Sequence, residues 1–300
     1  MSASSSSAAT FMESIKDQTP ARQQQLFKNA VSFADTAAGV KIQRVPASVV
    51  ARILKPYIVR KAYAQDPNAR PNYRECINDL SEDLQADPLV KAIYDFEKIF
   101  AVALQKKVDM FDSLVTLATL WNQNGSPSQA CLILAWKVEH GATRPVVVGA
   151  ATVIRAYMHD DLATTQEVLS DRDFEKVQPL LRAKSLLIDT MSSTQKGVGR
   201  VLLLHCIRYA SMRKMTGVLA LSYSGWAANV PQSKKLFEFM EFEKVVTKAT
   251  FKVQGYHGSW FFLPISKLPL HGIVEKAVRV CARRGLTAKT RDALIWRCPN

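Results

Sequence analysis

The sequence has no run of 18 apolar residues, and this excludes an ordinary membrane-spanning helix. Residues Met1–Thr10 are rich in serine and alanine, but they lack the basic start and the apolar centre of a secretory signal. We therefore expect a disordered tail followed by an intracellular protein, most simply a cytoplasmic one. Because Met1–Thr10 also lacks acidic residues, as organellar transit peptides do, import into an organelle is the alternative.

Cysteine is sparse, and no two cysteines form a CxxC pair. The five cysteines are odd in number and far apart, which argues against both a disulfide framework and a zinc site. We expect reduced, structural thiols and no bound metal. The cysteines are Cys76, Cys131, Cys206, Cys281 and Cys298.

Acidic residues are outnumbered, since 26 Asp and Glu face 40 Lys and Arg and leave a net charge of +14. A chain of this charge attracts polyanions. No nucleic-acid recognition motif accompanies the charge, so a solvated basic surface is the simpler interpretation, and a nucleic-acid or acidic partner is the alternative. The same charge would favour an anionic cofactor and disfavour a highly cationic substrate such as a polyamine.

Two common phosphate-binding loops, GxxxxGK[ST] and GxGxxG, do not fit the glycines of the stretch Lys184–Thr216. This stretch has an apolar run at Leu186–Ile188, a polar loop from Ser192, and Gly197 and Gly199 at the start of an apolar helix. Glycine lets an anion approach the backbone closely, and a helix N-terminus presents unsatisfied N–H groups. The stretch therefore predicts a phosphate cradle, although a tight turn alone would also explain two glycines.

The helix after these glycines has the pattern of a helix packed on a sheet. Its apolar rows start at Val198 and Leu203, whereas Arg200, Leu204 and Arg208 fall on the side expected to be more exposed. His205 lies among apolar neighbours, and we interpret it as a packed histidine.

Before residue 130 the pattern is mainly helical. Pro46 can open a helix, and Pro56 must kink or end it. The expected elements are a helix within 21–37, a strand over Val40–Val45, a helix covering Val49 to Leu54, helices over Pro71–Trp121 that break at Asp87-Pro88, and a loop over Asn122–Gln129.

After residue 130 the period changes to that of strands. Gly149 within the second of these strands suggests a bulge or a close backbone approach. The expected strands are Cys131–Val138, Val146–Tyr157, Leu186–Ile188, Val218–Tyr223, Lys244–Val253 and Trp260–Ile265, with hairpins between the first two and the last two. Helices are expected within Asp160–Arg182, after Gly197, within Ser233–Phe242 and in the basic segment Ser266–Asn300.

This order of elements resembles the GNAT superfamily of acyl-CoA-dependent N-acyltransferases. Its signature loop, (R/Q)xxGxG, lies between the fourth strand and the third helix, where this chain has Thr194–Gly199. Thr194 departs from the usual Arg or Gln, and Gln195 follows one residue later. The later family motif, close to AxxLYExxGF, has a degenerate counterpart in Ser233–Phe242.

The resemblance implies a fold and a division of the chain. The fold would be α/β (α+β), with a mixed, mostly antiparallel central sheet flanked by helices. The expected units are a tail and helix over 1–39, a GNAT-like domain over 40–265 with a helical insertion at about 71–121, and a basic helical extension over 266–300.

The resemblance also implies a cofactor site for acetyl-CoA, or another acyl-CoA, as co-substrate. The pyrophosphate would lie on the loop amides, and the pantetheine would pair with the signature strand. Lys196 and Arg200 would attract the phosphates, unless they are ordinary surface charges. The implied binding residues are Ile188, Asp189, Thr190, Gln195, Lys196, Gly197, Val198, Gly199 and Arg200.

Catalytic residues are harder to transfer from the family. The helix tyrosine that often protonates the leaving thiolate corresponds to Phe237, which has no proton to give. We therefore assign Tyr223, at the end of the preceding strand, as the candidate acid. Glu139 is the candidate base or substrate contact, together with its neighbour His140.

Two functions remain open from the sequence. The first is an acyl-CoA N-acyltransferase that transfers acetyl to a primary amine of a small molecule or protein by direct attack in a ternary complex. The second is a catalytically impaired GNAT-like module that binds CoA, nucleic acid or another partner. The retained glycines favour the first, and the lost helix tyrosine favours the second.

Overall fold

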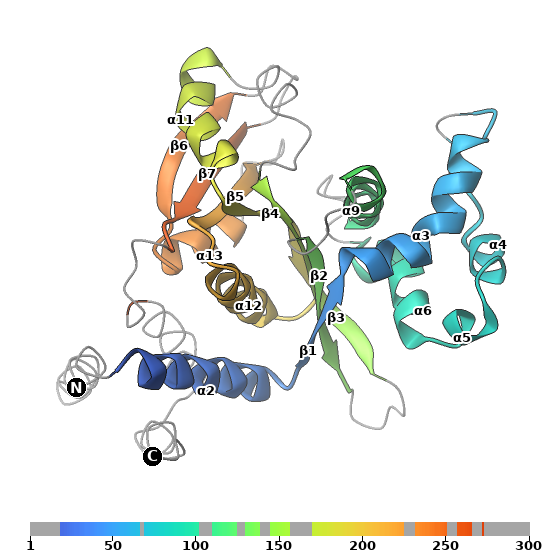
Figure 1. The fold of residues 1–300 in the computed structure, drawn as a ribbon, viewed down its shortest axis with the longest axis horizontal. Helices are drawn as coiled ribbons and strands as arrows, with labels where there is room; N and C mark the ends of the chain where they lie inside the picture. Colours follow the sequence, from blue (N-terminus) through green and yellow to red (C-terminus); the bar gives the residue numbers. More distant parts are fainter. Residues whose placement is uncertain are drawn as a thin grey trace.

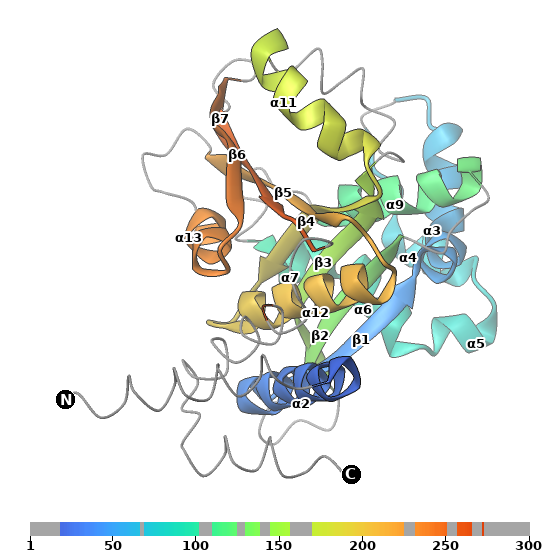
Figure 2. The same cartoon turned by 60° about the vertical axis from the view of Figure 1, so that its left-hand side comes forward.

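A seven-stranded sheet forms the centre of the protein, and helices cover both of its faces (Figures 1 and 2). The computed structural model describes residues 19–66, 69–101, 110–124, 130–138, 145–156, 170–224, 232–250, 257–265 and 272. The strands are β1 (Lys41–Pro46), β2 (Cys131–Lys137), β3 (Val146–Arg155), β4 (Ser185–Ser193), β5 (Gly217–Ser224), β6 (Glu243–Thr250) and β7 (His257–Leu263). The helices are α2 (Pro20–Ala38), α3 (Ala47–Ala62), α4 (Tyr73–Asn78), α5 (Glu82–Gln85), α6 (Pro88–Tyr94), α7 (Phe96–Ile99), α9 (Met110–Asn124), α11 (Asp171–Arg182), α12 (Val198–Met212) and α13 (Gln232–Phe239).

The strands follow the order β1-β2-β3-β4-β5-β7-β6. Each neighbouring pair is antiparallel except β4 and β5, which are parallel and are connected by the crossover helix α12. The predicted fold class, a mixed and mostly antiparallel sheet flanked by helices, is confirmed. Because β1 is the first strand of this sheet, β4 is the fourth, and the glycine loop follows it as the resemblance implied.

Side chains alternate across the sheet and supply two apolar clusters, one on each face. In β2, Leu132 and Leu134 contribute to the cluster under α3, α9 and α11, whereas Cys131 and Ile133 contribute to the cluster under α2 and α12. The two layers lie on opposite sides of the strands in Figure 1. The sheet is therefore held between two buried apolar cores.

The helix α3 continues through Pro56, so the expectation that Pro56 could end it is wrong. Proline removes the N–H that would bond the carbonyl four residues earlier, at Arg52. The helix persists because Ile53, Leu54 and Tyr57, on both sides of the proline, are fully buried. Tertiary packing offsets the lost hydrogen bond here.

Two other boundaries and the burial of one residue differ from the sequence prediction. Helix α9 extends to Asn124, into the predicted loop. Strand β4 extends to Ser193, because Ser192 and Ser193 pair with Ala150 and Gly149 of β3. Leu204 is fully buried, since α2 packs on the side of α12 that was expected to be exposed.

The remaining predicted elements between residues 19 and 265 agree with the structure where it describes them. Helix α6 begins after Asp87, whose carboxylate accepts a hydrogen bond from the Leu89 N–H at 2.8 Å. The tail 1–18 and the basic extension 266–300, apart from Gly272, lie outside the described residues. The division into units at 39/40 and 265/266 stays a prediction. Among the helices that the structure describes, none is both long and apolar enough to cross a membrane.

Candidate functional site

The two parallel strands separate in the middle of the sheet. Strand β4 pairs with β5 over Ser185–Ile188, opposite Gly217–Ala220. Beyond that point β4 continues with β3 to Ser193, and β5 continues with β7 to Ser224. Within the described part of the chain, β4 is therefore not paired with β5 beyond Ile188, and that side of the strand is a sheet edge at Thr190 and Met191. Ile188 is the last residue of β4 paired with β5.

A β-bulge lies in β4 at this point. Thr152 of β3 pairs with Thr190 and Val153 pairs with Ile188, so Asp189 is the extra residue. The Thr152 hydroxyl, which is fully buried, accepts the Thr190 N–H at 3.1 Å and lies 3.2 Å from Asp189 Oδ2. It also lies 2.7 Å from the Thr190 hydroxyl. Thr152 thus satisfies the backbone group that the bulge removes from the ladder.

The glycine loop is anchored on both sides. The Thr194 N–H and hydroxyl both donate to the Val148 carbonyl, at 2.9 and 3.2 Å. Lys137 Nζ donates to Gln195 Oε1 at 2.8 Å. These contacts tie the start of the loop to β2 and β3, beside the end of β4.

Gly197 adopts the left-handed conformation, with φ of 86°, and is the N-cap of α12. The Val198 and Arg200 N–H groups bond back to the Gln195 and Gly197 carbonyls. Within the described part of the chain, the Gly199 N–H donates no hydrogen bond to a backbone carbonyl. A free amide beside the positive end of a 15-residue helix is suited to an anion.

Gly149 allows the N-terminus of α12 to lie directly on β3. A Cβ at this position would be 2.7 Å from Val198 Cγ1 and 3.0 Å from Leu202 Cδ1. The β2–β3 register also shifts beside Gly149, between Ala135 and Trp136. The structure thus has a bulge next to Gly149, at Val148, and the close approach at Gly149 is made by side chains of α12.

Two cations belong to the loop and the first turn of the helix. Lys196 is exposed. The Arg200 guanidinium lies 5.1 Å from the centroid of the Phe239 ring on α13. This contact orients Arg200 on the side of α12 that faces α13, next to the helix N-terminus.

The residue at the family's tyrosine position is part of the core. Phe237 is only 3% exposed, and its ring lies 5.3 Å from those of Phe242 and Phe261. Glu241, where the family motif has glycine, has a positive φ of 57°. The N–H groups of Glu241 and Phe242 bond the Glu238 and Phe237 carbonyls, the pattern of a Schellman motif. The backbone of this segment thus forms a glycine-type turn although the residue in the turn is glutamate.

We expect Glu241→Gly to stabilise the protein by about 1 kcal/mol, because glycine adopts the left-handed conformation without steric cost. In thermal unfolding this corresponds to a rise in Tm of roughly 2–4 °C. Glu241→Ala removes the same charge but keeps the strain, and should give no such gain. Equal stability of the two variants would contradict the explanation.

Of the candidate catalytic residues, the structure describes only the backbone of Tyr223. The backbone of Tyr223 lies in β5 opposite Gly258, three residues beyond the parting of β4 and β5, and its side chain is outside the described residues. Glu139 and His140 also lie outside them. His205 is remote from the loop and is hydrogen-bonded to Asp35 of α2 at 2.9 Å, in agreement with a packing role.

The structure adds Thr152, which sequence reasoning missed. Its only signal in the sequence is a hydroxyl in the otherwise apolar run Val146–Ile154. Neither Thr152 nor Asp189 predicts the bulge in β4, because nothing in the sequence of either strand specifies the register between β3 and β4.

The three cysteines in the described part of the chain, Cys76, Cys131 and Cys206, are free and buried, as predicted for structural thiols. Burial raises the pKa of the Cys131 thiol to about 12 and also raises the pKa of Cys206, so neither is a reactive thiolate at neutral pH. Among the described residues, no three His, Cys, Asp or Glu side chains lie close enough together to hold a metal ion.

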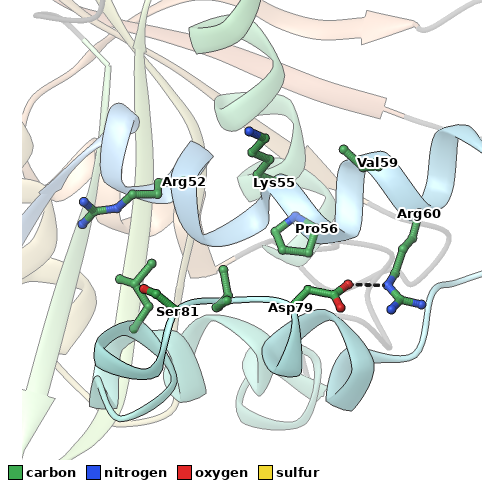
Figure 3. Close-up of a pocket in the computed structure, with 9 residues that line it drawn as sticks. Arg52, Lys55, Pro56, Val59, Arg60, Asp79 and Ser81 are labelled. Atoms are coloured by element: carbon green, nitrogen blue, oxygen red, sulfur yellow. Dashed lines mark hydrogen bonds and ion pairs between the residues drawn. The ribbon is translucent and has the colours of Figure 1, made fainter.

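A separate groove lies in the helical layer, between α3 and the segment Asp79–Leu84 (Figure 3). Arg60 on its wall is paired with Glu75 at 2.6 Å and Asp79 at 2.8 Å, and the hydrogen bond from Arg60 lowers the pKa of Asp79. The Asp79 carboxylate in this exposed groove is ionised and paired with Arg60, so it is not available as a general acid. The parting of β4 and β5 remains the candidate site.

Comparison with known proteins gives no match to a family model and no match among curated proteins. Among solved structures, the chain is similar to a GNAT-family protein of Desulfovibrio desulfuricans assigned as an acetyltransferase. The TM-score is 0.33 and the identity 8%, over 75% of this chain and 99% of that one. It is also similar to a protein of Bacillus anthracis assigned as a streptothricin acetyltransferase, solved in complex with acetyl coenzyme A. Here the TM-score is 0.28 and the identity 13%, over 45% of this chain and 63% of that one.

Both of these solved structures are assigned as acetyltransferases, and one of them is assigned to the GNAT family, which the sequence motifs of this chain resemble. TM-scores this low carry no argument about activity. The chain is an α/β protein with a mostly antiparallel, helix-flanked sheet, and its function is argued below from its own geometry.

Proposed function

We propose that the protein is an acyl-CoA-dependent N-acyltransferase that transfers acetyl from acetyl-CoA to a primary amine. One observation carries this proposal: β4 and β5 part after Ile188 and Ala220, and the glycine-capped N-terminus of α12 follows the free end of β4. The open strand edge suits an extended amide-containing chain, and the helix N-terminus suits its pyrophosphate.

The residues have complementary roles in this proposal. The side of β4 that no longer pairs with β5, at Thr190 and Met191, would bond the pantetheine amides, and the Gly199 N–H at the N-terminus of α12 would bond the phosphates. Lys196 and Arg200 would add charge attraction. The bulge at Asp189, which Thr152 stabilises by hydrogen bonds, would set the direction of β4 beyond Ile188.

The reaction would be a direct transfer in the ternary complex. The neutral amine attacks the thioester carbonyl, a C–N bond forms, and the C–S bond breaks with release of the CoA thiolate. The amine loses a proton to a base, and the thiolate gains one from an acid. Positioning of two bound reactants supplies much of the rate enhancement in such a step.

Calorimetry with acetyl-CoA, followed by a thiol-release assay against a panel of amines and peptides, tests the proposal. We expect saturable binding at one site and release of CoA that depends on the amine. Absence of acetyl-CoA binding would contradict the proposal.

If Tyr223 protonates the leaving thiolate, Tyr223→Phe should lower kcat by roughly 10²- to 10⁴-fold and leave acetyl-CoA affinity unchanged. Steady-state kinetics and calorimetry on the same preparation separate the two effects. Normal turnover in this variant would remove the assignment.

A second function is favoured by the burial of Phe237, which leaves no tyrosine at the family's acid position. The protein would then be a GNAT-like module that binds CoA without catalysis. Tight acetyl-CoA binding with no turnover on any amine would favour this function over the first.

A further inference from the structure

Two of the longer segments without an acidic residue come together in the fold. Residues 36–65 have six Lys and Arg and no Asp or Glu, and residues 190–237 have seven Lys and Arg and no Asp or Glu. The first segment includes the edge strand β1, and the second includes α12. The fold brings the C-terminal end of α12 beside β1, so these two segments without acidic residues meet on one surface (Figure 2).

Two arginines converge where the segments meet. The Arg44 guanidinium of β1 lies 5.2 Å from the centroid of the Tyr209 ring, and that of Arg213, the C-cap of α12, lies 5.5 Å from it. The two cations are therefore within about 11 Å of each other. Both side chains are exposed, whereas Tyr209 is only 4% exposed.

No carboxylate neutralises this pair within the described part of the chain. Arg60 and Arg70, in contrast, each reach two carboxylates in the helical layer. Burial raises the pKa of the Tyr209 hydroxyl to about 12, so the group between the arginines is neutral at physiological pH. The positive charge of Arg44 and Arg213 thus remains available to an external anion.

Two lysines extend the charge. Lys214 follows Arg213 directly and is exposed, and it occupies the left-handed position of a Schellman motif, where glycine would be less strained. Lys184 is also exposed, and its carbonyl accepts the Thr216 N–H at 2.8 Å, two residues from Lys214. We name Arg44, Arg213, Lys214 and Lys184 the Tyr209 basic patch.

We propose that the Tyr209 basic patch binds the phosphate backbone of a nucleic acid. Guanidinium groups bind phosphate through paired hydrogen bonds, and several unpaired cations within reach of successive phosphates give affinity through counterion release. Because the Tyr209 ring is buried under the arginines, it is not available for stacking, so the patch would contact the backbone and not the bases. Binding should therefore depend on salt and little on sequence.

The patch is separate from the proposed acyl-CoA site. Helix α12 has 15 residues, and so about 22 Å separates the glycine loop at its N-terminus from Arg213 at its C-terminus. Nucleic-acid binding at the patch does not require acyl-CoA binding at the glycine loop. Variants of the patch should therefore keep the wild-type affinity for acetyl-CoA.

Fluorescence anisotropy of the full chain with a labelled DNA duplex of random sequence, and with an RNA strand of equal length, tests the proposal. At 0.1 M salt each phosphate contact contributes about eightfold to duplex affinity. Arg44→Gln/Arg213→Gln should therefore weaken binding more than tenfold and make the log–log salt slope shallower by about 2.

A matched control removes the same charge elsewhere. Arg60→Gln/Lys244→Gln deletes two cations that are paired with carboxylates, Lys244 with Glu238 at 2.7 Å. It should retain affinity within about twofold. Equal losses in both double variants would show a general charge effect and overturn the proposal.

Two further results would overturn it. The first is that neither nucleic acid binds to the wild-type chain, and the second is that polyglutamate competes as well as nucleic acid does, which would identify an acidic protein partner. Thermal unfolding of each variant checks that folding is retained. If Arg44 and Arg213 serve only the helix end, the variant will lose Tm with unchanged nucleic-acid affinity, and the proposal fails.

Discussion

Replacing Gly199 by alanine is expected to weaken acetyl-CoA binding by about tenfold or more, a loss of about 1.4 kcal/mol, while the fold stays intact. The protein itself has room for the added methyl group. A Cβ at Gly199 would meet Ser193 Oγ at 3.6 Å and Leu236 Cδ2 at 3.8 Å, which are ordinary contacts, and its φ is not positive. Any loss of affinity therefore reports on a ligand that approaches the backbone closely.

A substitution at Gly199 tests ligand binding more directly than a substitution at Gly197. Both glycines belong to the predicted cradle, but Gly197 has φ of 86°, so any side chain there strains the backbone whatever binds to it. Gly199→Val should weaken binding further than alanine does.

Calorimetry with acetyl-CoA measures the effect of each Gly199 variant, and thermal unfolding confirms that each is folded. Ser211→Ala, near the other end of the same helix, is the control and should keep wild-type affinity. An unchanged dissociation constant in a folded Gly199→Ala protein would mean that the loop is only a turn.

Replacing Thr152 by valine is expected to destabilise the protein by about 1–3 kcal/mol, because the partly buried Thr190 N–H and the Asp189 carboxylate each lose a hydrogen bond to the Thr152 hydroxyl. The side chain keeps its shape, so the loss reflects hydrogen bonding. Without the Thr152 hydroxyl, the Thr190 N–H at the bulge has no acceptor in its place, and the free edge of β4 loses its support. We therefore also expect weaker acetyl-CoA binding, by about fivefold or more, about 1 kcal/mol.

The control for Thr152→Val is the hydroxyl pair at the other end of β4. Ser185 and Thr216 are 3.0 Å apart where β4 and β5 are still paired. Thr216→Val should cost stability in denaturant unfolding but leave the affinity for acetyl-CoA unchanged. If the two variants weaken acetyl-CoA binding equally, the bulge has no special role in the site.

Local patterns in the sequence were sufficient for most elements of the sheet. Two apolar, β-type runs joined by a turn-like segment predicted β2 and β3 and their pairing, and the turn signals around Gly197 predicted the start of α12. These features depend on residues near one another in the chain, so the sequence carries them directly.

The sequence failed where distant segments decide the outcome. Pro56 does not end α3, because burial on both sides of it outweighs one lost hydrogen bond. Leu204 is buried because α2, which is about 170 residues earlier, covers it. The Asp189 bulge and the Thr152 contacts depend on the register of β3 against β4, which no local pattern specifies.

The sequence by itself determined the order of strands and helices, the glycine loop and the excess of positive charge, since each follows from periodicity, turn residues or composition. Only the tertiary structure decided that β4 and β5 part at Ile188, that Phe237 is a core residue, and that Arg44 and Arg213 meet over Tyr209. The physical reason is that pairing register and side-chain burial are set by contacts between segments far apart in the chain.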